Sequence, residues 1–164
     1  MSARAATGAR ETAPVLLGAG PDSPAQTVEF AFGEADRRGV PLWAVRAWWD
    51  PDVDLGRPQD AHLARWDAAC RRESDDLTAQ LSAAVCRYPG VAVRPVVVND
   101  HPAAVLAALA ARAQLLVLGP PAGDGGDSSP ASVLVRTAPC PVVVVPSPLS
   151  RPTAAAARLA AGVR

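Results

Sequence analysis

The sequence lacks lysine and isoleucine altogether, has only three cysteines in 164 residues, and carries no excess of either charge. Its 16 arginines balance 16 acidic residues, which argues against a nucleic-acid-binding module, because such modules carry a basic excess. The small, odd number of cysteines disfavours a secreted disulfide framework. No apolar run approaches the ~20 residues that span a membrane, and residues 1–13 lack the apolar core of a secretory signal. We therefore expect a cytoplasmic protein that contacts neither nucleic acid nor a membrane.

The remaining composition is typical of one globular domain. With 49% apolar and 20% charged residues, the chain has enough apolar surface to bury a core. We expect a flexible arm over 1–13, one α/β domain over 14–146 and a flexible tail over 147–164, because the two terminal segments show no apolar periodicity. The tail has three arginines and no acidic residue, so a basic, partner-binding tail is the alternative interpretation.

Short apolar runs alternate with amphipathic segments along the domain. The runs predict strands at Val15–Gly18, Leu42–Trp48, Val91–Val98, Leu115–Leu118 and Val142–Val145. Helical spacing predicts helices ending at Gly39, over Leu63–Tyr88, over Pro102–Ala113 and over Ser129–Thr137. Continuous apolar strands separated by helices predict a doubly wound, five-stranded parallel sheet with helices on both faces, a Rossmann-like α/β fold. Ligands of such a sheet bind at the carboxyl ends of its strands, where the strand order reverses.

Two prolines refine this prediction. Asp22 and Ser23 are suited to cap the first helix, with Pro24 in its first turn. Pro95 interrupts a valine-rich strand, and proline cannot donate to a neighbouring strand on that side. We therefore expect the strand that contains Pro95 to lie at an edge of the sheet.

With this layout, the sequence resembles the universal stress protein family over roughly 14–146. The resemblance rests on LGAGPDSPA after the first strand, on GVPLWAVRAW, on YPGVAVRPVVVNDHPAAVLAALAARAQLLVLG, and on VRTAPCPVVVV at the end. It implies a five-stranded parallel sheet, a cytoplasmic location and a homodimer formed through the last strand. The family divides into members that bind ATP and members that do not.

The nucleotide signature of that family is altered in this sequence. The signature is Gly, two residues, Gly, nine residues, Gly, and then Ser or Thr, because glycine lets backbone N–H groups approach phosphates. Gly119 fits the first position, whereas Gly123 stands one residue late. The end of the motif aligns with Ser128 and Ser129, which makes the loop four residues shorter than the signature requires.

The charge of this loop also disfavours a triphosphate. The loop contains Asp124 and Asp127, and no arginine lies between Arg112 and Arg136. Each close carboxylate–phosphate pair repels by about 1 kcal/mol in water, whereas a helix N-terminus returns only about 0.3–1 kcal/mol. We therefore expect that the protein does not bind ATP tightly.

The other half of the family's site is an aspartate just after the first strand. That position holds Gly20 here, and Asp22 restores the match only with a one-residue insertion. The same segment partly resembles the pyrophosphate loop Ser-Gly-Gly-x-Asp-Ser of adenylylating enzymes, but Pro21 removes a donor from it. We therefore expect no enzyme, and we carry Gly20, Asp22, Gly119, Gly123, Ser128 and Ser129 only as weak candidate ligand contacts.

Histidine and tryptophan offer further candidates near the expected crevice. His62 and His101 are 39 residues apart, which predicts neither a metal site nor a catalytic triad. His101 follows a strand, so a ligand contact is the alternative to a plain helix start. Trp48 and Trp49 end a strand at the same edge, where one ring has the position to stack on a base.

The cysteines are expected to be small buried apolar residues. Cys70 and Cys86 are 16 residues apart on one helix, which places them about 160° apart around its axis. They therefore cannot pair within that helix, and Cys140 lies at the entry of the last strand. A redox role has no support in the sequence.

The last strand is the expected contact with a partner. Val142, Val143, Val144 and Val145 form an unprotected apolar run that would pair with another chain at a sheet edge. The function that follows is a regulatory or partner-binding homodimer that needs no cofactor. An ATP or AMP sensor with a shortened glycine-rich loop is the alternative, with ATP as its cofactor.

Overall fold

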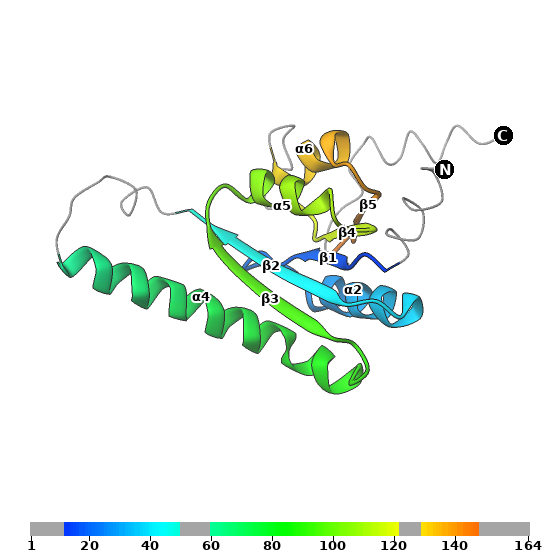
Figure 1. Cartoon of the computed structure of the whole chain (residues 1–164), viewed down its shortest axis with the longest axis horizontal. Coiled ribbons are helices and arrows are strands. Elements are labelled where there is room, and N and C mark those ends of the chain that lie inside the picture. The colour runs from blue at the N-terminus through cyan, green and yellow to red at the C-terminus, as the bar shows by residue number, and fades with distance from the viewer. Residues whose placement is uncertain (1–11, 50–59, 122–128, 148–164) are drawn as a thin grey trace, which may run out of the picture.

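The computed structural model describes residues 12–49, 60–121 and 129–147, and in them a five-stranded parallel sheet with four helices. The strands are β1 (Val15–Gly18), β2 (Leu42–Trp48), β3 (Val93–Asn99), β4 (Leu115–Leu118) and β5 (Val142–Val144). The helices are α2 (Ala25–Arg38), α4 (Asp60–Arg87), α5 (Pro102–Ala110) and α6 (Pro130–Thr137). The sheet order is β3-β2-β1-β4-β5 (Figure 1). The predicted Rossmann-like fold is confirmed, and none of the described helices is long and apolar enough to cross a membrane.

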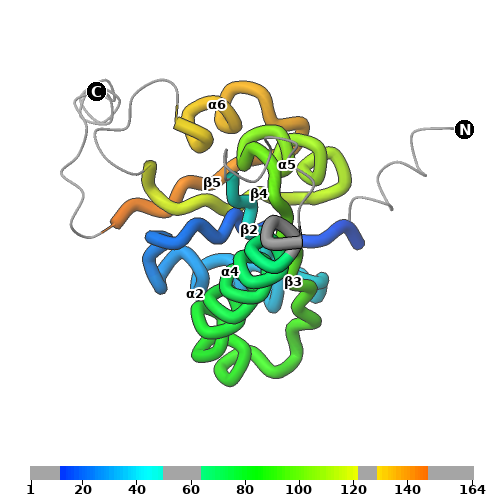
Figure 2. Tube along the Cα trace, turned by 90° about the vertical axis from the view of Figure 1, so that its left-hand side faces the viewer, coloured from blue at the N-terminus to red at the C-terminus, as the bar shows by residue number. Residues whose placement is uncertain are grey.

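The helices cover the two faces of the sheet in pairs. Helices α2 and α4 lie on one face, and α5 and α6 lie on the other (Figures 1 and 2). Neighbouring residues of β1 enter opposite cores: Leu17 packs with Phe32 of α2, whereas Leu16 packs with Leu106 of α5. All four residues of β1 and all four of β4 are buried, as the continuous apolar runs predicted.

The predicted strand positions hold, with small shifts at the ends. Strand β3 lies at one edge, as Pro95 predicted, and Pro95 pairs with Ala44 of β2. Strand β5 lies at the other edge and ends at Val144, although the Val145 N–H still donates to the Leu118 carbonyl at 2.8 Å. Helix α5 ends at Ala110, three residues earlier than its apolar pattern suggested.

The start of α2 differs from the prediction. Its N-cap is Pro24, and neither Asp22 nor Ser23 caps it. The Ser23 hydroxyl instead accepts a hydrogen bond from the Gly20 N–H at 2.9 Å, inside the preceding loop. The end of α2 is as expected, because Gly39 adopts a left-handed conformation with φ of 63°.

The prediction that the cysteines are buried is wrong. Cys86 is exposed, and Cys70 and Cys140 are only partly buried. The helical repeat of α4 explains the error: Leu77, Leu81 and Ala84 already occupy the buried stripe, and Cys86 lies two residues beyond that stripe. The predicted terminal arm and tail lie almost entirely outside the described residues.

Candidate functional site

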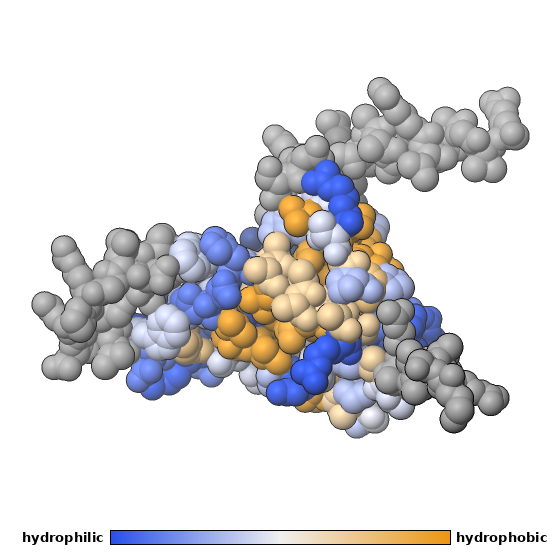
Figure 3. Space-filling model, turned by 45° about the horizontal axis from the view of Figure 1, so that its top comes forward, coloured by the Kyte–Doolittle hydropathy of each residue, from blue (hydrophilic) through white to orange (hydrophobic). Residues whose placement is uncertain are grey.

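A crevice lies at the carboxyl ends of β1 and β4, where the strand order reverses. Its volume is about 280 Å³. Val45 and Ala47 of β2, Leu106 of α5 and Leu118 of β4 form apolar walls. Figure 3 turns the α5 and α6 side toward the viewer and shows apolar residues gathered there, consistent with the entirely apolar sequence of α5. The crevice is where a ligand of this fold class is expected to bind.

The lining of the crevice is unusually rich in proline. Among the sixteen lining residues that the structure describes, only Asp22 and Ser23 have polar side chains, and none is basic. Five lining residues have no backbone N–H: Pro21, Pro102, Pro120, Pro121 and Pro130. This lining favours apolar surface and offers few donors to an anion.

Most backbone N–H groups of the loop between β1 and α2 already donate hydrogen bonds within the protein. Ala19 donates to the Val45 carbonyl at 2.8 Å, Gly20 donates to the Ser23 hydroxyl, and the Ser23 N–H donates to the Gly20 carbonyl at 3.2 Å. Within residues 19–23, the Asp22 N–H therefore remains as the single backbone donor without a partner. A phosphate cradle needs several such donors.

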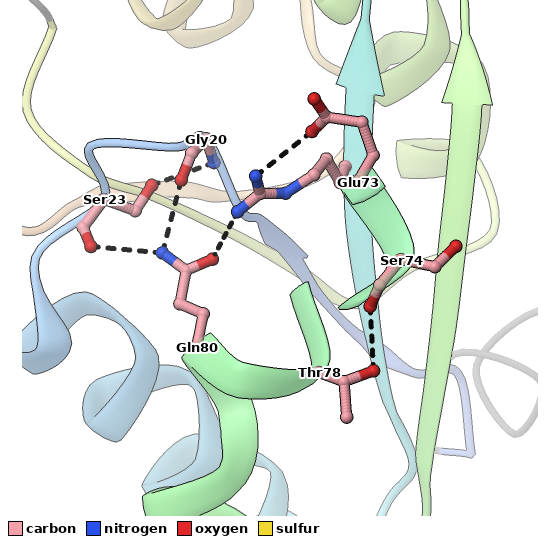
Figure 4. A network of polar contacts seen from close by, with 7 residues as sticks. Gly20, Ser23, Glu73, Ser74, Thr78 and Gln80 are labelled. Atoms are coloured by element: carbon pink, nitrogen blue, oxygen red, sulfur yellow. Dashed lines mark hydrogen bonds and ion pairs between the residues drawn. The ribbon is translucent and has the colours of Figure 1, made fainter. Parts of the chain in front are cut away.

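The same loop is held from behind by a buried polar relay (Figure 4). Gln80 of α4 donates to the Gly20 and Ser23 carbonyls, each at 3.2 Å. The side-chain oxygen Oε1 of Gln80 accepts a hydrogen bond from Arg46 of β2 at 2.9 Å, and Arg46 also forms an ion pair with Glu73 at 3.2 Å. The Arg46 side chain is only 4% exposed. The crevice wall is thus fixed by contacts on the opposite face of the sheet.

The N-terminus of α6 is likewise satisfied by its own residues. Ser129 is the N-cap, and its hydroxyl accepts from the Ser132 N–H at 3.1 Å while donating to the Ser132 hydroxyl at 2.8 Å. The first residue of the helix is Pro130, which has no N–H to offer. Little of the anion-binding capacity of this helix end is therefore left for a ligand.

Gly18 leaves room for leucine side chains at the wall of the crevice. A Cβ at Gly18 would lie 2.6 Å from Leu118 Cδ2 and 3.1 Å from Leu106 Cδ1. A Cβ at Gly119 would lie 3.4 Å from Pro24 Cδ and 3.6 Å from the Thr27 hydroxyl, which are ordinary van der Waals distances. A larger residue at position 18 would therefore displace Leu118 or Leu106, whereas position 119 has room for a Cβ.

The structure brings together some of the residues proposed from the sequence. Gly20, Asp22 and Gly119 all line the crevice, and Ser129 immediately precedes the lining residue Pro130. Gly123 and Ser128 lie outside the described residues. Sequence inspection missed Arg46 and Gln80; the available signal was a lone charge in the otherwise apolar strand LWAVRAW.

The aromatic candidates pack on one another beside the crevice. The Trp49 ring stacks on the His101 ring with centroids 4.4 Å apart, and Trp48 contacts Trp66 of α4 at 5.7 Å. Neither tryptophan lines the crevice, and His101 does not line it either. The side chain of His62 lies outside the described residues. Among the residues described, no cluster of His, Cys, Asp or Glu is suited to a metal ion.

Curated proteins similar to this chain come from mycobacteria. A universal stress protein of Mycobacterium tuberculosis is 38% identical over 147 residues, which cover 83% of this chain and 44% of the relative. Another from the same organism is 39% identical over 141 residues, covering 80% of this chain and 45% of the relative. The chain spans less than half the length of these relatives.

Solved structures share the fold at lower identity. The universal stress protein UspA of Lactobacillus plantarum aligns with a TM-score of 0.60 and 20% identity, over 82% of this chain and 97% of that one. A universal stress protein solved in complex with cAMP aligns with a TM-score of 0.52 and 23% identity, over 82% and 96%. These similarities support the five-stranded α/β architecture.

The match to a family model extends over nearly the whole described fold. The model of the Universal stress protein family matches residues 12–146, from three residues before β1 to two residues after β5. This match agrees with the relatives, the strand order and the crevice at the β1–β4 switch point. The chain belongs to the universal stress protein family.

Proposed function

We propose that this universal stress protein domain is a regulatory, partner-binding module that does not hold ATP tightly and catalyses no reaction. The observation that carries the proposal is the chemistry of the crevice. Its described lining has no basic side chain, and prolines or internal hydrogen bonds have removed most of its N–H donors. A triphosphate needs both kinds of group, because its charge has to be compensated when water is removed.

The sequence of the adjoining loop supports the same proposal. It carries Asp124 and Asp127, with no arginine between Arg112 and Arg136. Each carboxylate close to a phosphate costs about 1 kcal/mol in water, and the cost rises as water is excluded. The N-terminus of α6, which is capped by Ser129, stabilises a nearby anion by at most about 0.3–1 kcal/mol.

A nucleotide sensor is the second candidate. Its support comes from structures of the same fold: one universal stress protein was solved in complex with cAMP, and an Arabidopsis family protein was solved with AMP bound. A monophosphate carries less charge than ATP and therefore needs fewer hydrogen-bond donors from the crevice. Gly20, Asp22, Gly119, Gly123, Ser128 and Ser129 are the residues that would contact it under this alternative.

Calorimetric titration of the full chain with ATP and with AMP, with and without magnesium, tests the proposal. We expect no ATP binding below millimolar concentration and no nucleotide in the mass spectrum of the purified protein. The double variant Asp124→Asn/Asp127→Asn serves as a matched control with the same loop length. A gain in ATP affinity would show that charge blocks the site, whereas micromolar ATP binding by the unaltered chain would overturn the proposal.

We also propose that the module acts as a homodimer paired through β5. Val143 is half-buried against the α2–α4 core, and Val142 and Val144 are half-buried against the α5–α6 core. The Val145 N–H points toward β4, so strand alternation turns the backbone of Val144 outward, toward the unpaired edge. An outward-facing apolar edge strand is a template for a second chain.

A proline at this position tests the dimer without breaking the β4–β5 pairing. Val144→Pro removes the outward N–H and changes a half-buried side chain, whereas Val144→Thr keeps the N–H and the β-branched shape. By light scattering after size exclusion, we expect the threonine variant to remain dimeric and the proline variant to become monomeric while keeping its circular dichroism spectrum. A proline variant of unchanged mass would refute this interface.

A further inference from the structure

We propose that the crevice takes a small, mostly apolar molecule of one or two rings that presents an amine or hydroxyl donor to Asp22. This inference rests on the proposed function, because it assumes that the crevice is not occupied by ATP. It adds a ligand class to a site whose geometry otherwise only argues against a highly charged ligand.

Size and shape set the first limit on the ligand. A volume of about 280 Å³ lies just below the range of ligand pockets, which are ~300–1,000 Å³. Val45, Ala47, Leu106 and Leu118 line one part with aliphatic groups, and proline rings line much of the rest. A flat or compact apolar ligand gains free energy by burying its surface against such walls, whereas an extended polar chain finds no hydrogen-bonding groups on them.

The charge of the crevice sets the second limit, because the single charged side chain among its described lining residues is the carboxylate of Asp22. Asp22 contributes a carboxylate that has no ion-pair partner among the described residues. Ser23 keeps its hydroxyl oxygen engaged with the Gly20 N–H. A ligand with a donor near Asp22 gains a hydrogen bond, whereas a ligand with an anionic group there meets repulsion.

The backbone on both sides of Asp22 is held by the rest of the fold, whereas the Asp22 side chain is exposed at the rim of the crevice. Gln80 holds the carbonyls on both sides of it, at Gly20 and Ser23, and Arg46 in turn holds Gln80. Pro21, which directly precedes Asp22, has a fixed φ of its own. Because the backbone of this loop is already ordered, a ligand that binds at Asp22 does not have to order it, which lowers the entropic cost of binding.

Three molecules with one ring system separate these features: indole is neutral, tryptamine carries an amine, and indole-3-acetate carries a carboxylate. Their affinities for the full chain are measured by ligand-observed NMR titration. We expect tryptamine to bind about two- to fivefold more tightly than indole, the range of an exposed charge pair, and indole-3-acetate to bind more weakly than indole. Equal or tighter binding of indole-3-acetate would overturn the inference.

Substitutions in the protein identify the site. Asp22→Asn is expected to reduce tryptamine affinity to that of indole and to leave indole affinity unchanged. Ala47→Phe and Ala131→Leu fill the crevice from opposite walls, and both are expected to abolish binding of all three molecules at a retained circular dichroism spectrum. Ring binding that persists in both filled variants would place it elsewhere and refute the proposal.

The outcomes separate this inference from the proposed function. If none of the three molecules binds while ATP also fails to bind, the ligand class is wrong and the proposed function stands. If ATP binds at micromolar concentration and displaces tryptamine, the proposed function fails, and with it the basis of this inference.

Discussion

Removal of Gln80 is expected to destabilise the domain more than removal of Arg46, although Arg46 is the charged member of the pair. Gln80→Leu takes away one acceptor for Arg46 at 2.9 Å and two donors for loop carbonyls at 3.2 Å. Arg46 is then left 4% exposed with one guanidinium nitrogen newly unpaired, in addition to its Nε, which already has no partner. A buried polar group left without a partner costs about 1–3 kcal/mol, and more when charged.

Arg46→Leu leaves fewer buried polar groups without a partner than Gln80→Leu does. Arg46→Leu removes the buried cation together with its unpartnered Nε, and the remaining Glu73 side chain is 24% exposed and within reach of water. We expect Gln80→Leu to lower the free energy of unfolding by about 3 kcal/mol and Arg46→Leu to lower it by about 1 kcal/mol. The double variant should resemble Arg46→Leu, which corresponds to a coupling energy of about 3 kcal/mol.

Urea unfolding of the four proteins measures these differences at constant m-value. At this chain length, each kcal/mol corresponds to a melting-temperature shift of about 2–4 °C, so the two single variants should differ clearly in a thermal scan. The reasoning would be refuted if Arg46→Leu cost as much as Gln80→Leu, or if the two losses simply added.

Three further predictions concern single buried positions. Thr27 is fully buried and its hydroxyl has no partner, so Thr27→Val should raise stability by about 1 kcal/mol in urea unfolding, and a loss would contradict this. Burial alone would raise the pKa of Glu34, but hydrogen bonds from Arg37 and Arg38 outweigh it and lower the pKa. The stability lost in Glu34→Gln should therefore be full above the ordinary value of 4.5 and disappear as pH falls through the lowered folded value; a pH-independent loss would be inconsistent with this. Gly18→Ala places a methyl group 2.6 Å from a β4 leucine, so it should cost about 1–3 kcal/mol and weaken binding in the crevice, as titration and urea unfolding would show.

The fold was predictable because its signals are local and repeated. Four-residue apolar runs mark β1 and β4, Gly39 marks the end of α2, and Pro95 marks an edge strand. Each of these sequence signals reflects backbone geometry or the burial of a strand on two faces. None of them depends on side chains that are distant in the sequence. Errors arose where two local interpretations competed, as at Ser23, whose hydroxyl turned to Gly20 instead of to the helix.

The candidate site was predictable only in position. The reversal of strand order at β1 and β4 located the crevice, and Gly20, Asp22 and Gly119 are among its lining residues. Sequence spacing could not show that Gln80, 60 residues away, takes the Gly20 carbonyl. Sequence spacing also could not show that most backbone N–H groups of the β1–α2 loop already donate to other groups, because the partner of each N–H depends on the folded chain.

The two edges of the sheet differ in a way that limits growth of an assembly. Strand β3 carries Pro95 in its interior, and proline cannot offer a donor to a further strand, whereas Val142–Val144 of β5 contain no such block. A sheet with two equivalent open edges can add copies without end and form a filament. If β5 pairs with a second copy as proposed, the interrupted β3 edge of each copy offers no equivalent site, and the assembly would stop at two chains.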